Sequence, residues 1–262
     1  MSPNDIRKSI IRATYNARSS HIGSCLSIVE ILYVLYFRVM NIDPANPLKS
    51  DRDILILSKA HASAALYATL AERGFFPKEY LDRFSVNGGI LPEHLDKGTA
   101  PGIETSGGSL GMGLSLGVGM AIASRLGNPR KRFFVVLSDG ECEEGSIWEA
   151  VMLASTLKLK NLIAIVDFNG LQAFGRTNEI IDQSNLSERW RSFGWETYDV
   201  DGHDVDELER LLRLDQSRPR ALVAHTTKGK GISFMEDRLE WHYRSLDKTK
   251  YEQAMRELGE GV

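Results

Sequence analysis

The 262-residue chain lacks most features that mark secreted, membrane or metal-cluster proteins. It has only two cysteines, Cys25 and Cys142, and their spacing fits neither a disulfide framework nor a zinc site. No apolar run approaches the roughly 18 residues that span a bilayer. Basic side chains interrupt the N-terminal segment 6–15, which argues against a signal peptide. These absences favour a cytoplasmic protein and give no reason to expect a membrane partner.

An excess of basic charge is also missing. The formal net charge is -3, and Lys and Arg are interspersed among Asp and Glu, so no basic patch for nucleic acid is expected. No linker rich in proline and serine divides the chain, and there are no internal repeats. The length suffices for a full α/β core. We therefore interpret residues 1–262 as a single domain.

Short apolar runs alternate with segments of helical character along most of the chain. Strands are expected at 53–57, 133–137, 162–168, 195–200 and 221–226, and helices at 28–40, 62–72 and 149–158. Strands that alternate with helices over short connections are typical of a parallel sheet with helices on both faces. The sequence thus predicts an α/β fold.

Two of the expected strands end at a side chain that suits a metal ion. Asp139 and Gly140 follow the run 133–137, and Asn169 follows the run 162–168. Ligands of open parallel sheets collect outside the carboxyl ends of the strands. Asp139 and Asn169 should face one another there, and their oxygens suit Mg²⁺ bound to a diphosphate. An Asp-Gly pair alone is usually a turn, so the whole pattern carries the interpretation.

The segment 138–169 resembles the thiamine diphosphate motif of the transketolase family, in which Gly-Asp-Gly is followed by Asn after the next strand. Ser138 replaces the first glycine, which is a mild departure because the metal ligand is the aspartate. The resemblance implies the thiamine-diphosphate-binding fold. It also implies Mg²⁺, or Ca²⁺ or Mn²⁺ in its place, held by Asp139, Asn169 and the backbone carbonyl of Leu171.

The glycine-rich segment 101–123 permits close approach of the backbone to a ligand or to another helix. From the residues alone, packing is the favoured role, because no strand precedes the glycines as a dinucleotide site requires. The segment resembles the transketolase turn that contacts the cofactor, here Gly108, Ser109 and Leu110. In that family the helix that follows packs at the dimer interface.

Four of the six histidines occur in sequence contexts that match the same family: His21, His61, His94 and His242. Any one of them would more often be structural, and none forms a pair at metal-ligand spacing. An imidazole titrates near about 6.5, which suits proton movement at neutral pH. The resemblance implies that His61 and His242 border cofactor and substrate, and that His21 and His94 act on donor hydroxyls. We assign His203 and His225 to turns and packing.

Together these motifs imply the diphosphate-binding subunit of a split transketolase, which moves a two-carbon ketol unit from a ketose, or its phosphate, to an aldose. A pyrimidine-binding domain is expected on a partner chain, in an α2β2 heterotetramer. Glu144 resembles the acid that links cofactor sites across the dimer, although Glu141 and Glu143 lie close by. The loop 228–231 resembles the family loop before the last active-site histidine, but its charge alone is typical of a solvated loop.

Three alternatives remain open at this point. A divergent thiamine-diphosphate-dependent enzyme of a specialised pathway would transfer a ketol or acyl group. The α subunit of a 2-oxo acid dehydrogenase carries the metal-diphosphate motif on a separate chain, but it is not expected to share the histidine contexts. An inactive regulatory subunit is expected to have lost the metal ligands or the histidines.

Overall fold

The structure is a computed structural model that describes residues 1–127 and 130–260; the other four positions of the expected domain 1–262 lie outside the described residues. Its centre is a parallel sheet of five strands in the order β1-β2-β3-β5-β4. The strands are β1 (Ile54–Leu57), β2 (Phe133–Ser138), β3 (Leu162–Phe168), β4 (Glu196–Asp201) and β5 (Arg220–His225). The predicted strands are confirmed, with ends that differ by at most one residue.

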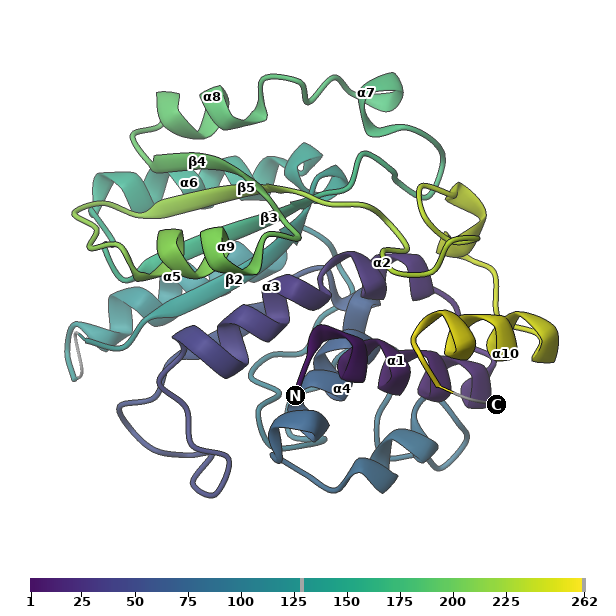
Figure 1. Cartoon of the computed structure of the whole chain (residues 1–262). Helices are drawn as coiled ribbons and strands as arrows, with labels where there is room; N and C mark the ends of the chain where they lie inside the picture. The colour runs from purple at the N-terminus through teal and green to yellow at the C-terminus, as the bar shows by residue number, and fades with distance from the viewer. Residues whose placement is uncertain (128–129, 261–262) are drawn as a thin grey trace.

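Helices cover both faces of the sheet, which confirms the predicted α/β fold (Figure 1). They are α1 (Pro3–Ala17), α2 (Ile22–Ser27), α3 (Val29–Val34), α4 (Ser63–Arg73), α5 (Met112–Ser124), α6 (Gly145–Thr156), α7 (Thr177–Ile180), α8 (Leu186–Ser192), α9 (Val205–Arg213) and α10 (Lys248–Glu257). Short 3-10 segments span Ala60–Ala62, Lys78–Arg83, Gly140–Glu143 and Leu239–His242. Among the described residues, no helix is long and apolar enough to cross a bilayer.

Successive residues of each strand serve two separate cores, because strand side chains alternate between faces. On β2, Phe134 and Val136 belong to the core beneath α1, α3, α4 and α9. Phe133 and Val135 belong to the core beneath α5, α6 and α8. The sheet is therefore buried on both sides, which explains why its strands are nearly continuous apolar runs.

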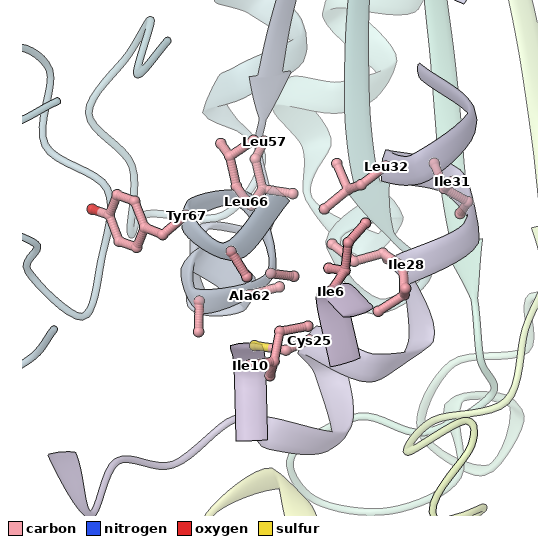
Figure 2. Close-up of a cluster of buried hydrophobic side chains, with 14 of the residues drawn as sticks. Ile6, Ile10, Cys25, Ile28, Ile31, Leu32, Leu57, Ala62, Leu66 and Tyr67 are labelled. Carbon is pink, nitrogen blue, oxygen red and sulfur yellow. The ribbon is translucent and has the colours of Figure 1, made fainter. Parts of the chain in front are cut away.

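The larger core joins the N-terminal helices to the sheet. Figure 2 shows Ile6 and Ile10 of α1 gathered with Leu32 of α3 and Leu66 of α4. Cys25 lies among these side chains as a buried free thiol. The C-terminal helix α10 packs against α1 (Figure 1), so the first and the last helix of the described chain are in contact in this half of the molecule.

Two helices differ from the expected ranges for local reasons. The helix expected at 28–40 is α3 followed by a π-helical turn over Leu35–Val39, which closes with a bond from Met40 N to Leu35 O. Helix α6 begins at Gly145 rather than at 149, because Glu144 has the extended backbone of an N-cap residue. The early start places Glu144 at the rim of the cleft described next.

Candidate active site

Four strands end in polar residues at one edge of the sheet, because parallel strands share the direction of their carboxyl ends. Lys59 follows β1, Asp139 follows β2, Asn169 follows β3, and Thr226 follows β5. A cleft with a volume of ≈ 310 Å³ opens at this edge. Most of the candidate site residues named from the sequence line it, together with several that the sequence did not single out.

Asp139 lies at the floor of the cleft and is only 2% exposed. Its carboxylate accepts hydrogen bonds from the backbone N–H of Gly140 and Gly170, both at 2.8 Å, and from Thr177 Oγ1 at 2.9 Å. Burial and the nearby carboxylate of Asp167 raise the pKa of Asp139 to about 6. A cation in the cleft would offset the charge of this carboxylate.

Asn169 and Leu171 line the same cleft as Asp139. The Asn169 side chain donates through Nδ2 to Asp167 Oδ2 at 3.0 Å, and its Oδ1 accepts from Leu171 N at 3.1 Å. The donation to Asp167 fixes the orientation of the amide. One carboxylate, one amide oxygen and the Leu171 carbonyl form an oxygen donor set that fits Mg²⁺. Within the described residues, no three His, Cys, Asp or Glu side chains gather as a metal site, so no competing set of that kind is present.

A wholly buried ion pair between Lys59 and Asp167 supports this floor. Both side chains are 0% exposed, and Lys59 Nζ donates to Asp167 Oδ2. Asp167 also accepts hydrogen bonds from Ser27 Oγ at 2.6 Å and from Thr226 Oγ1. Burial opposes ionisation of Asp167, but Lys59 together with the hydrogen bonds from Ser27 and Thr226 holds the pKa of Asp167 below its usual value. The pair thus joins the ends of β1 and β3 under the predicted metal ligands.

Lys228 is 1% exposed, so its own charge is buried, whereas Lys230 and Gly231 of the same loop are in contact with solvent. Its Nζ lies 3.1 Å from the Leu171 carbonyl oxygen and 2.9 Å from His242 Nδ1. Burial, and then repulsion by Lys59, lower the pKa of Lys228 to about 8. At neutral pH the group is mainly an ammonium and can only donate, so His242 Nδ1 accepts and its Nε2 carries the proton.

The four histidines named from the sequence converge at one end of the cleft. Ring centroids of His21 lie 5.5 Å from His61, 5.2 Å from His242 and 6.0 Å from His94. Burial lowers the pKa of His21 and of His61, and burial together with Lys228 lowers that of His242 to about 3. Three of these rings, those of His21, His61 and His242, line the cleft as neutral imidazoles at pH 7. His94 is exposed and lies outside the lining.

The glycine-rich turn 108–110 and the acidic loop 141–144 form the rim of the cleft. Gly108 and Leu110 line the cleft, whereas Ser109 between them does not. A Cβ on Gly108 would contact the His94 ring at 3.7 Å, and its φ of 146° is one that side chains rarely adopt. Glu144 lines the cleft and is exposed. Glu141 is fully buried, and its carboxylate accepts a hydrogen bond from Gly111 N at 2.8 Å, so it has a partner within this chain.

Lys59 and Asp167 are the main site residues that the sequence did not single out. Asp167 is the one acid within the apolar run 162–168, and a charge inside a buried strand is a recognisable signal of a partner. Lys59 carries no such signal, because its burial depends on Asp167 more than a hundred residues later. The aromatic ring of Phe174, 87% exposed on the loop that leads out of the cleft, was also not expected.

Comparisons with known proteins identify the family of the chain. Residues 2–261 match the family model of the transketolase thiamine diphosphate binding domain. The chain is 39% identical to one of the subunits of apulose-4-phosphate transketolase from Phocaeicola vulgatus, over 98% of this chain and 92% of that protein. It is 42% identical to a 6-deoxy-6-sulfo-D-fructose transketolase subunit of a Clostridium species, over 97% of this chain and 94% of the relative.

A solved structure shows the same fold. The transketolase of Campylobacter jejuni superposes with a TM-score of 0.91 at 30% identity. The match covers 98% of this chain but only 42% of that transketolase, so the chain spans about two fifths of it. With a family model that matches nearly every residue and relatives matched over almost their full length, this chain belongs to the transketolase family as a thiamine diphosphate binding domain.

Proposed function

We propose that the chain is the diphosphate-binding subunit of a split transketolase, which transfers a two-carbon ketol unit from a ketose donor to an aldose acceptor. One observation carries the proposal: a single cleft joins an oxygen donor set, Asp139, Asn169 and the Leu171 carbonyl, to three neutral imidazoles. A metal-diphosphate site needs the oxygen donors, and a sugar with several hydroxyls needs the imidazoles. Two of the relatives are named for a sugar phosphate and for a sulfo-sugar, which favours a donor with an anionic group.

In this proposal, Asp139, Asn169 and the Leu171 carbonyl hold Mg²⁺ on the diphosphate. When bound, thiamine diphosphate supplies the nucleophilic carbon and the electron sink for breaking a carbon–carbon bond. Gly140 and the turn Gly108–Leu110, which includes Ser109, border the cofactor. The chain's own task is to orient the substrate, exclude water and move protons at its hydroxyls.

Each histidine has a different role, set by the hydrogen bonds that its imidazole can make. His242 presents Nε2–H to the cleft, because its Nδ1 accepts from Lys228, so it donates to an oxygen of substrate or cofactor. His61 borders the cofactor between His21 and His242. His21 acts on a donor hydroxyl, and His94, exposed beside it, contacts the sugar at the entrance.

A partner subunit completes the proposed enzyme. Three relatives that match over more than nine tenths of their own length are named as transketolase subunits. We infer that a second chain supplies the pyrimidine-binding domain, in an α2β2 assembly located in the cytoplasm, and that Glu144 rather than Glu141 reaches across the interface. Helices α5 and α6 pack together and leave Met112, Leu116, Met152 and Leu153 between 41% and 51% exposed, which suits self-association.

Calorimetric titration of the assembled enzyme with thiamine diphosphate and Mg²⁺ tests the proposal. Asp139→Asn keeps the shape of the side chain but removes its charge, so affinity should fall at least about 10-fold. Asp51→Asn, a change at an exposed acid outside the cleft, is the control and should bind normally. Equal affinity of the Asp139→Asn variant and the unmodified enzyme would remove Asp139 from the metal site.

A further inference from the structure

A chain of hydrogen bonds leads from His21 away from the cleft. Ser20 Oγ lies 3.0 Å from His21 Nδ1 and 3.1 Å from Glu93 Oε1. Glu93 Oε1 is itself 3.4 Å from His21 Nδ1, and Ser85 Oγ donates to the other carboxylate oxygen at 3.3 Å. The ring of His21 thus has a serine and a carboxylate on its Nδ1 side and the cleft on the other.

Counting protons fixes the direction of each bond. Burial opposes ionisation of Glu93, but the bonds from Ser20 and the nearby His21 hold its pKa below the usual value, so the carboxylate only accepts. Ser20 has one hydroxyl proton, and it goes to Glu93. The proton between Ser20 Oγ and His21 must then belong to Nδ1. His21 is therefore the Nδ1–H tautomer, with an Nε2 lone pair free to accept.

The backbone of His21 is held in a conformation that costs energy. Its φ is 65°, in the left-handed region that residues other than glycine seldom occupy. Its N–H donates to the His242 carbonyl at 2.9 Å, and its carbonyl accepts from Cys25 N at 3.1 Å. These bonds hold the backbone of His21 in place beside the cleft. A strained residue over-determined in this way is commonly functional.

Several ionisable groups face the His21 ring from the elements packed around it: Glu93, His94, His61, His242, Tyr243 and Lys228. Glu93 favours the protonated ring, whereas His94 and Lys228 disfavour it. His21 and His242 also complement one another. The first presents an acceptor to the cleft and the second presents a donor, which matches a substrate whose hydroxyls both donate and accept.

We propose that Ser20 and Glu93 are positioning residues that hold His21 in its Nδ1–H tautomer, so that Nε2 takes the proton of a donor-sugar hydroxyl. This inference rests on the proposed function. In the step, the hydroxyl O–H bond breaks and an Nε2–H bond forms, while the electron pair stays on the sugar oxygen. The imidazolium keeps its Nδ1–H on Ser20 and is stabilised by Glu93, which stays ionised. Return of the proton from Nε2 to an oxygen of the product restores the neutral ring.

The tautomer can be measured without substrate or partner. Long-range ¹⁵N–¹H NMR spectra of the isolated chain, with His21 assigned by comparison with His21→Gln, should show Nδ1 protonated and Nε2 unprotonated at neutral pH. Ser20→Ala should weaken this preference, since it removes the nearer of the two acceptors on the Nδ1 side. An Nε2–H tautomer in the unmodified chain would overturn the proposal, whatever the enzyme's activity.

Turnover by the assembled enzyme gives the second test. Ser20→Ala and Glu93→Gln should each lower kcat about 10- to 100-fold, the scale on which a partner that orients a ligating imidazole contributes. Affinity for thiamine diphosphate, measured by calorimetry, should not change. Because both residues act through His21, adding Glu93→Gln to His21→Ala should cause no further loss. In the single variant Glu93→Gln, the acid limb of kcat should move to lower pH, since the carboxylate no longer stabilises the imidazolium.

The outcomes separate the two proposals. If His21→Ala keeps normal turnover, the role of His21 in the proposed function fails. If His21→Ala loses turnover but Glu93→Gln changes kcat independently in both backgrounds, His21 stands and the positioning role of Glu93 is overturned. Loss of cofactor affinity in Ser20→Ala and Glu93→Gln would show a structural effect on the cleft and would also contradict it.

Discussion

The buried pair Lys59–Asp167 gives the strongest prediction about stability. Lys59→Met removes the ammonium and keeps most of the side-chain volume, which leaves the Asp167 carboxylate uncompensated in a site that is 0% exposed. Breaking such a pair typically costs about 3–5 kcal/mol. Asp167 retains donors from Ser27, Thr226 and Asn169, so we expect the lower value, about 3 kcal/mol. For a domain of this size that corresponds to a fall in Tm of roughly 6 to 12 °C.

The pH dependence of this loss identifies its cause. In the unmodified chain Lys59 lowers the pKa of Asp167, so the contribution of Asp167 is present above its unfolded value and is lost as pH falls. In Lys59→Met, the hydrogen bonds from Ser27 and Thr226 are left to oppose burial without the ammonium, so the pKa of Asp167 rises. The variant therefore gains stability from protonation as pH falls, and the gap between the two proteins should narrow from pH 7 towards pH 5.

Urea unfolding at both pH values, followed by tryptophan fluorescence, measures the effect. Lys97→Met, at an exposed lysine, is the matched control and should change stability by less than about 0.5 kcal/mol. A loss below about 1 kcal/mol in Lys59→Met, or a gap that stays constant with pH, would refute the argument that an unpaired buried carboxylate is responsible.

Two further predictions concern the cleft and the helical surface. His242→Ala should retain cofactor but lower kcat by roughly 10²- to 10⁴-fold, the scale for a positioned proton donor. The control is His225→Ala, at a ring 53% exposed outside the cleft, which should leave kcat unchanged. Steady-state assays with several ketose donors check this, and near-normal turnover in His242→Ala would reject its role. Leu116→Glu on α5 should weaken self-association in analytical ultracentrifugation, while Leu48→Glu, at a site 85% exposed elsewhere, should leave self-association intact. Unchanged self-association in Leu116→Glu would exclude the α5 face as the contact surface.

The strands and the floor of the cleft could be predicted because their signals are local. Apolar runs of five to seven residues, each followed by Asp-Gly or Asn, specify both a buried parallel strand and what lies at its end. Asp139 and Asn169 follow neighbouring strands, so the sheet itself brings them together.

The polar network beneath the cleft could not be predicted in the same way. Whether a lysine is solvated or buried depends on a partner distant in sequence, and both Lys59 and Lys228 find theirs only in the folded chain. The role of Ser20 and Glu93 depends on the same kind of contact, across 73 positions. Local sequence shows that a residue is polar, but the tertiary fold determines its hydrogen-bond partner.

The central claim is that this chain forms one part of a thiamine-diphosphate-dependent ketol transferase and needs a partner subunit. The most direct measurement is two-carbon transfer from a ketose phosphate to an aldose by the purified chain with thiamine diphosphate and Mg²⁺, with and without the candidate partner. A cofactor contacted by both subunits links their association to its affinity, so transfer should appear only in the mixture, together with tighter cofactor binding. Strong transfer by the chain alone would contradict the account.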